Sequence, residues 1–130
     1  AVRACSPLPG RAAQTVNVEY KPSDASASPY LTVGALLTAG LDGLERRLDP
    51  PRPVKVDPAV LSAQERAEQG ITRLPQSPGE ALDALEEDEV LSSALGDELV
   101  RAFVAVRRSE WQLSADQDVD AIVASHRLRY

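Results

Sequence analysis

Residues 14–21 alternate between apolar and polar side chains, the pattern of a β-strand with one buried face. The apolar side carries Val16, Val18 and Tyr20, and the polar side carries Asn17, Glu19 and Lys21. A single strand cannot satisfy its own backbone hydrogen bonds, so it needs partner strands. The sequence offers no second strand of comparable quality. We therefore expect the partners upstream of residue 1 or in another chain.

A helix is predicted over residues 28–49, where apolar side chains recur at spacings of three and four. The stripe consists of Tyr30, Val33, Leu37, Leu41, Leu44 and Leu48. Ser28 is a suitable N-cap, and Pro29 suits the first helical position. Gly34 and Gly40 lie inside the helix and disfavour it relative to alanine. Such glycines indicate close approach by another element.

The rest of the chain is predicted to be a proline-rich crossing over residues 50–76 and a helical layer over residues 77–130. Helix starts are indicated by capping boxes at residues 62–65, 77–80 and 114–117 and by Asp97, whose helix is expected to run to about Gln112. Gly70 is a plausible helix stop. With the loop and strand of residues 1–27 and the helix of residues 28–49, the arrangement is α+β.

Two packing predictions follow from these patterns. The strand face of Val16, Val18 and Tyr20 is expected to pack on the helix at Leu37, Leu41 and Leu44. In the helical layer, Phe103 and Trp111 are expected to be core residues, because aromatic side chains at helical spacing usually are.

Composition narrows the classes of function. The 130 residues carry 14 Lys and Arg against 20 Asp and Glu, a formal charge of −6, which argues against general nucleic-acid binding. No apolar run approaches the ~20 residues needed to cross a bilayer, and no signal peptide is visible, so a cytoplasmic location without membrane contact is expected. One cysteine, Cys5, excludes an internal disulfide. The absence of methionine leads us to expect a processed product or a piece of a larger chain.

Self-contained catalytic motifs are absent from the sequence. There is one histidine, His126, and there is no glycine-rich phosphate loop, GxSxG elbow or HExxH motif. The acidic run at residues 86–89 is interpreted as a solvated helix end. The polar strand face permits two interpretations. It can simply face water, or it can line a cavity in which Glu19 binds Mg²⁺ and Lys21 binds an anionic substrate.

Residues 18–48, VEYKPSDASASPYLTVGALLTAGLDGLERRL, resemble the carboxyl-terminal signature of the glutamine synthetase family. In that signature, an Arg-x-Glu-x-Arg strand leads through a loop to Ala-Asn-Pro-Tyr-Leu and then to a helix ending Ala-Gly-Leu-Asp-Gly. Residues 27–31 and 39–43 stand in those places. Weaker resemblance continues through residues 80–99 and 103–111 to Tyr130. Arg3 resembles the second arginine of the family's Asn-Arg-x-x-x-x-Arg motif.

The resemblance implies the carboxyl-terminal piece of the glutamine synthetase catalytic barrel, with one or two antiparallel strands followed by a mostly helical layer. It implies an ATP-dependent ligase that couples glutamate to ammonia or another amine through a γ-glutamyl phosphate, with Mg²⁺ or Mn²⁺. By motif position, Glu19 matches a metal ligand, Lys21 a contact to substrate and phosphate, and Arg3 a contact to the ATP phosphates. The complete enzyme is expected to be a homo-oligomer.

Several positions depart from the family pattern. Asn17 and Lys21 stand where the classical strand has arginines, and Ser28 replaces an asparagine. No tyrosine lies between residues 49 and 75, where some bacterial members carry an adenylylated tyrosine. These departures resemble divergent relatives that act on amines other than ammonia. Alone, the segment is expected to be inactive, because the family's other metal ligands precede it. The alternatives are a stand-alone helical interaction module and a catalytically dead relative.

Overall fold

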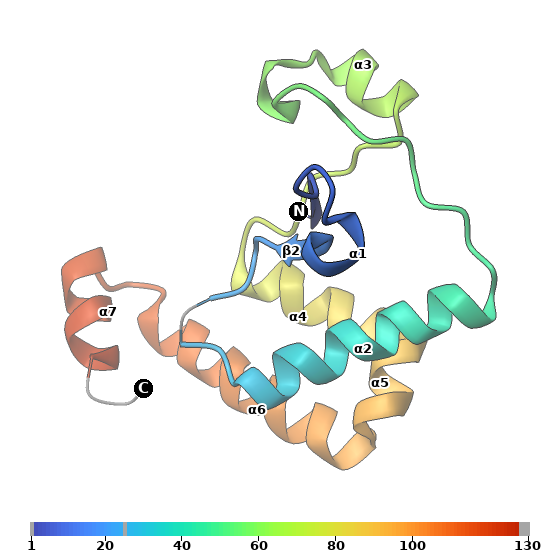
Figure 1. Cartoon of the computed structure of the whole chain (residues 1–130). Helices are drawn as coiled ribbons and strands as arrows, with labels where there is room; N and C mark the ends of the chain where they lie inside the picture. Colours follow the sequence, from blue (N-terminus) through green and yellow to red (C-terminus); the bar gives the residue numbers. More distant parts are fainter. Residues whose placement is uncertain (1, 25, 128–130) are drawn as a thin grey trace. The chain divides into compact units, whose positions relative to one another are not determined.

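The computed structural model describes residues 2–24 and 26–127, and the predicted α+β class is confirmed (Figure 1). Two antiparallel strands come first and helices follow. The chain forms two compact units, residues 1–36 and 37–130, with the boundary inside helix α2. Tyr130, the final aromatic residue of the family resemblance, lies outside the described residues.

The first unit contains a β-hairpin. Strand β1 spans Val2–Cys5 and pairs antiparallel with β2, Asn17–Tyr20; the short helix α1, Ala12–Thr15, lies between them. Strand β1 was not predicted from its own residues, and Gln14 and Thr15, expected in the strand, are helical instead. The Thr15 hydroxyl explains this difference: it accepts from the Leu8 backbone N–H (2.9 Å) and donates to the Arg11 carbonyl (2.8 Å). These local bonds favour a folded connection over an extended one.

Helix α2, Pro29–Glu45, begins where the sequence predicts and ends four residues early. The Thr32 N–H donates to the Ser28 carbonyl, which places Ser28 at the helix start. At the other end, the Leu48 N–H donates to the Gly43 carbonyl (2.9 Å) and the Arg47 N–H to the Leu44 carbonyl (3.1 Å). This is the Schellman pattern, with Arg47 at a φ of 52° in the position that usually holds glycine.

The proline-rich segment contains a 3₁₀ turn, Pro58–Val60, and helix α3, Ala63–Glu68. The capping box predicted at residues 62–65 is confirmed. The Glu65 N–H donates to the Ser62 hydroxyl (3.2 Å), and the Glu65 carboxylate accepts from the Ser62 N–H (2.7 Å). Gly70, at a φ of 65°, follows the helix as predicted.

Helices α4, Pro78–Glu87, α5, Glu89–Leu95, and α6, Asp97–Ser114, contact one another. Among the described residues, the buried core consists of Leu82, Val100 and Val104, with Leu85, Leu95 and Phe103 packed against it. The core assignment of Phe103 is thus confirmed. Arg108 of α6 pairs with Asp83 (2.5 Å) and Glu86 of α4, which adds an ionic contact across the helix pair.

Helix starts in this layer match the sequence in part. Ser77 caps α4 by accepting from the Glu80 N–H (3.1 Å), although the Glu80 carboxylate binds the Gln76 N–H rather than that of Ser77. The box predicted at residues 114–117 is wrong, because Ser114 ends α6. Helix α7, Val119–His126, is capped by Asp118 instead.

The predicted burial of two apolar faces is also wrong. Val16, Val18 and Tyr20 are 63%, 66% and 42% exposed, and the three leucines expected to pack on them are 58–76% exposed. The least exposed residue of β2 is Glu19, on the polar side. On the charged face, ion pairs from Arg3 and Lys21 partly cover Glu19, whereas the two strands alone offer nothing to cover the apolar face.

Candidate active site

The hairpin brings all three predicted site residues to one face. Arg3 lies directly opposite Glu19 in the antiparallel ladder, and directly paired residues project to the same side of a sheet. Lys21 follows Glu19 by two residues, so it projects to that side as well. The alternation of apolar and polar residues that predicts the strand therefore also places these charged side chains on one face.

Glu19 forms ion pairs with both cations. Its Oε2 atom lies 2.7 Å from Lys21 Nζ and 3.5 Å from Arg3 Nη1. Hydrogen bonding to Lys21 and its charge lower the pKa of Glu19, and the more distant charge of Arg3 adds to this. The carboxylate is therefore ionised at neutral pH. The side chains of all three residues are 40–64% exposed, so water and ligands can reach them.

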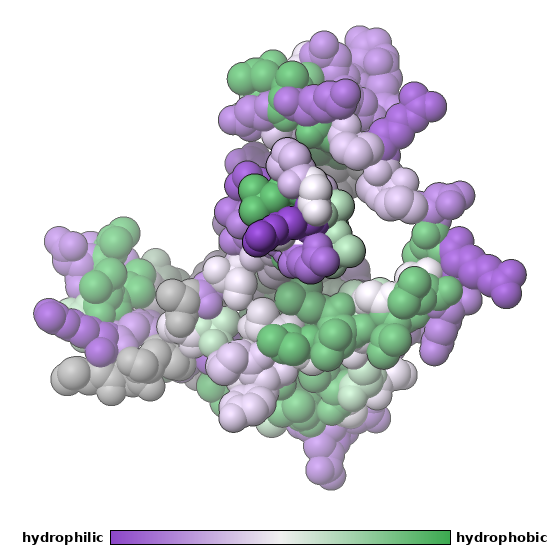
Figure 2. Space-filling model, viewed as in Figure 1, coloured by the Kyte–Doolittle hydropathy of each residue, from purple (hydrophilic) through white to green (hydrophobic). Residues whose placement is uncertain are grey.

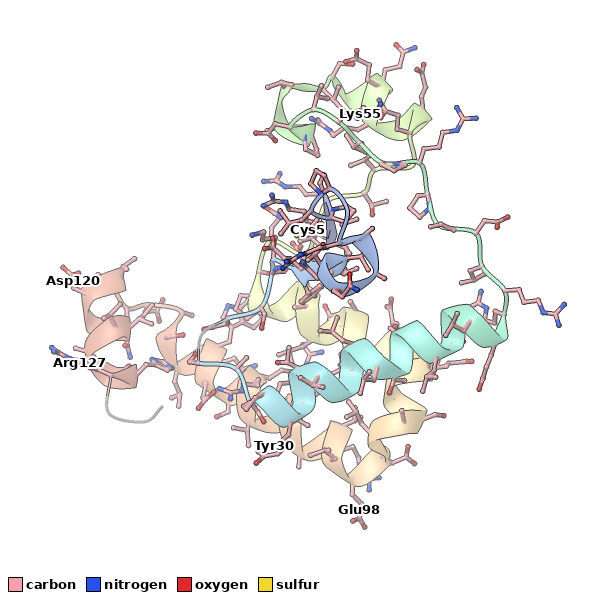
Figure 3. The ribbon with its side chains drawn as sticks, in the orientation of Figure 1. Cys5, Tyr30, Lys55, Glu98, Asp120 and Arg127 are labelled. Atoms are coloured by element: carbon pink, nitrogen blue, oxygen red, sulfur yellow. The ribbon has the colours of Figure 1, made fainter. Side chains whose placement is uncertain are left out.

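Cys5, at the end of strand β1, is a further neighbour of this cluster. Cys5 is two residues from Arg3 in β1, so it lies on the same face, and its thiol makes a smaller contribution to lowering the pKa of Glu19. Figure 3 labels Cys5 in the hairpin. The Arg-x-Cys spacing at residues 3–5 could have signalled it, had β1 been predicted.

Asn17 lies on the same face as Glu19, directly opposite Cys5, but adds no charge to it. The Asn17 side-chain amide donates to the Thr15 carbonyl (3.1 Å), a bond that belongs to the hairpin connection. In the loop after β2, Asp24 Oδ1 accepts from the N–H (2.7 Å) and the hydroxyl (2.9 Å) of Ser26. This turn precedes Ser28 and the start of α2.

A divalent metal would find only part of a site here. Within residues 2–24 and 26–127, no group of three or more His, Cys, Asp or Glu side chains is placed to hold a metal ion. Mg²⁺ takes six oxygen ligands, several of them water or phosphate. Glu19 can supply one oxygen, and the remaining protein ligands would have to come from other residues.

A second concave feature lies within the helical unit. A groove of about 410 Å³ is lined by α4, α6 and α7, including Leu82, Phe103 and Trp111. Trp111 was expected in the core but is 39% exposed, with its ring against Gly79. His126 also lines the groove, and its Nδ1 lies 2.9 Å from the Ile122 carbonyl oxygen.

Comparisons with known proteins identify the class of this chain. A family model for the glutamine synthetase catalytic domain matches residues 1–123. The chain is 36% identical over all 130 residues to the gamma-glutamylpolyamine synthetase GlnA3 of Streptomyces coelicolor, of which it covers 28%.

It is 34% identical over 104 residues to a glutamine synthetase of Methanocaldococcus jannaschii and 42% identical over 95 residues to one of Pyrococcus furiosus. These matches cover 80% and 73% of the chain but only 23% and 21% of the relatives. The chain thus spans about a quarter of the length of the relatives it matches. It belongs to the glutamine synthetase family. No helix in the described ranges is long and apolar enough to cross a membrane.

Proposed function

We propose that residues 1–130 form part of the catalytic domain of an ATP-dependent ligase that joins glutamate to ammonia or another amine. The observation that carries this proposal is the hairpin face on which Glu19 lies between Arg3 and Lys21, in a chain of the glutamine synthetase family. An exposed carboxylate beside two cationic side chains suits a site that binds both a metal ion and phosphate groups.

In the proposed reaction, glutamate's γ-carboxylate takes the terminal phosphoryl group of ATP, giving a γ-glutamyl phosphate and ADP. The amine then attacks the acyl carbon, and inorganic phosphate and a proton leave. A bound Mg²⁺ or Mn²⁺ would offset the charge of the phosphates. Glu19 would supply one oxygen ligand to it.

Arg3 and Lys21 would bind anionic oxygens on the same face. The guanidinium of Arg3 can bind two phosphate oxygens at once, whereas the ammonium of Lys21 acts as a point charge. Exposed ion pairs are individually weak, so Lys21 can exchange Glu19 for a phosphate oxygen at little cost in free energy.

The acceptor is proposed to be an amine larger than ammonia. Lys21 and Asn17 replace the arginines of the classical strand. One relative that is matched over all 130 residues is a gamma-glutamylpolyamine synthetase by name. A diamine or polyamine is therefore the acceptor class to test beside ammonia.

A hybrid protein tests the proposal. In this hybrid, residues 1–130 replace the matching segment of the Streptomyces coelicolor relative. ATP-dependent phosphate release is measured with glutamate, Mg²⁺ and, in turn, ammonia, a diamine and a polyamine; the intact relative serves as the positive control. We expect release that Glu19→Gln removes and Lys21→Met lowers about 100-fold, while Glu87→Gln, an exposed acidic position on α4, leaves it unchanged. A folded hybrid that releases no phosphate with any amine would instead indicate a catalytically dead relative.

A further inference from the structure

A lysine lies on the charged face of the hairpin, in a chain that otherwise favours arginine. Of the 14 Lys and Arg residues, only two are lysines, Lys21 and Lys55. Lys21 shares its face with Arg3 and Glu19, and its side chain is 58% exposed. Figure 2 shows strongly hydrophilic surface over part of this hairpin. An arginine at position 21 would supply the same charge, so the primary amine is what distinguishes this side chain chemically.

The amine of Lys21 and the guanidinium of Arg3 lie close together. Lys21 Nζ is 2.7 Å and Arg3 Nη1 is 3.5 Å from the same oxygen, Glu19 Oε2, so the two nitrogens cannot be further apart than these distances combined. A phosphate group held by the guanidinium would therefore lie within reach of the amine. In an acyl phosphate, a single oxygen separates the phosphorus from the acyl carbon. The pair thus suits an acyl phosphate bound by its phosphate at Arg3, with its acyl carbon towards Lys21.

The two cationic side chains differ in what they can do to such a group. Arginine stays protonated in proteins, so its guanidinium binds a phosphate without attacking it. A lysine amine can act as a nucleophile. The ion pair between Lys21 and Glu19 is exposed, and exposed pairs are individually weak, so Lys21 can leave it at little cost in free energy. Lys21 is therefore placed to compete with an acceptor amine for the acyl group.

We propose that Lys21 is a self-acylation site. Its Nζ attacks the acyl carbon of an acyl phosphate bound at Arg3; the C–N bond of an amide forms, and the bond from the acyl carbon to the bridging oxygen breaks. The ammonium gives up two protons in this reaction, and both leave with the inorganic phosphate. For its natural acyl donor, the γ-glutamyl phosphate, this inference rests on the proposed function.

Acylation of Lys21 would regulate the site that carries it. The amide nitrogen is uncharged, so the point charge of Lys21 and its ion pair with Glu19 are both lost. Abundant acceptor amine consumes the acyl phosphate before Lys21 reacts. When the amine is scarce, the acyl phosphate persists and Lys21 is modified. The modification would thus stop the use of ATP when no amine is present to accept the glutamyl group.

Acetyl phosphate tests the reactivity of Lys21 without any ligase activity. The 130-residue chain is incubated with it, and peptide mapping by mass spectrometry gives the acetylation rates of Lys21 and Lys55. Lys55, labelled in Figure 3, is the matched control, since it is exposed in the segment after α2. We expect Lys21 to react at least about tenfold faster, and the two rates to converge when the chain is unfolded in urea. Equal rates in the folded chain would overturn the proposal.

Two arginine variants test the part that Arg3 plays. Arg3→Met should abolish the preference for Lys21, because it removes the group that binds the phosphate. Arg11→Met removes another exposed arginine of the hairpin unit, at the start of α1, and should leave the preference intact. A preference that survives Arg3→Met would refute the proposed pairing of the two side chains.

The hybrid protein separates self-acylation from the proposed ligase activity. With ATP, glutamate and Mg²⁺ but no acceptor amine, we expect Lys21 to gain the mass of one glutamyl group, and saturating amine to suppress this gain. Lys21→Arg should remove the modification, whereas Lys55→Arg should leave it unchanged. Phosphate release without modification of Lys21 would overturn self-acylation and leave the proposed function intact. Preferential acetylation of Lys21, together with a hybrid that releases no phosphate with any amine, would uphold self-acylation and defeat the proposed function.

Discussion

Gly79, at the start of α4, leaves room for the ring of Trp111. A Cβ atom at position 79 would lie 2.4 Å from Trp111 Cη2 and 2.5 Å from Cζ3. Carbon atoms pack best at about 3.5–4.0 Å. Gly79→Ala must therefore displace the Trp111 ring from α4 or move the start of the helix.

Two opposing contributions set the size of the effect. Overpacking a well-packed site typically costs about 1–3 kcal/mol. Replacing a helical glycine with alanine gains up to about 1 kcal/mol. Because the clashing atoms are the outer edge of a ring that is 39% exposed, the clash belongs at the lower end of its range. The two contributions therefore nearly cancel, and we expect a net loss of less than about 1 kcal/mol in the free energy of unfolding.

A double-mutant cycle followed by far-UV circular dichroism in urea measures the effect. In a Trp111→Ala background the clash is gone, so Gly79→Ala should become stabilising. Gly43→Ala is the matched control: it is a helical glycine of α2 with nothing within 4 Å of an added Cβ, and it should be stabilising in both backgrounds. If Gly79→Ala stabilises the protein equally with and without Trp111, the packing described here is wrong.

Three further predictions concern charges and caps. Lys21→Met should raise the pKa of Glu19 towards its ordinary value, since Lys21 is the largest cause of its lowering; carboxyl NMR titration measures this, and an unchanged midpoint would contradict the ion pair. Hydrogen bonds from Ser62 lower the pKa of Glu65 below its ordinary value, which carboxyl NMR titration measures. The cap therefore stabilises α3 fully at pH values above the pKa that Glu65 has in the unfolded chain. This stabilisation is lost as the pH falls through the lower pKa of Glu65 in the folded chain. A helical signal that does not change on acidification would argue against the capping box. Ser77→Ala should cost about 1 kcal/mol of stability in urea unfolding but Ser77→Gly only a few tenths, and equal losses would show that capping is not the cause.

Elements fixed by local chemistry were predictable from the sequence. The box at residues 62–65, the stop at Gly70 and the start of α2 each depend on side chains within a few residues, and each lies where it was predicted. The box at residues 114–117 fails for a local reason too. The Ser114 hydroxyl donates back to the Glu110 and Trp111 carbonyls, and this binds it to the helix that it ends.

Burial was harder to predict, since it depends on partners distant in sequence. Periodicity shows which side of the strand and of α2 is apolar, but not what covers it. Strand β1 was missed because its partner residues lie 12–18 positions away and its own four residues show no clear alternation. Arg3, Glu19 and Lys21 were each named from motif position, and the structure brings them together on one face of the hairpin; the roles assigned to them stay predictions.

Glu19 in the hybrid protein tests the proposed function most directly. ATP-dependent phosphate release should require glutamate and an amine, and Glu19→Gln should remove it while Glu87→Gln does not. Release that persists at the unmodified rate in Glu19→Gln would show that the hairpin face plays no part in catalysis and would contradict the proposed site.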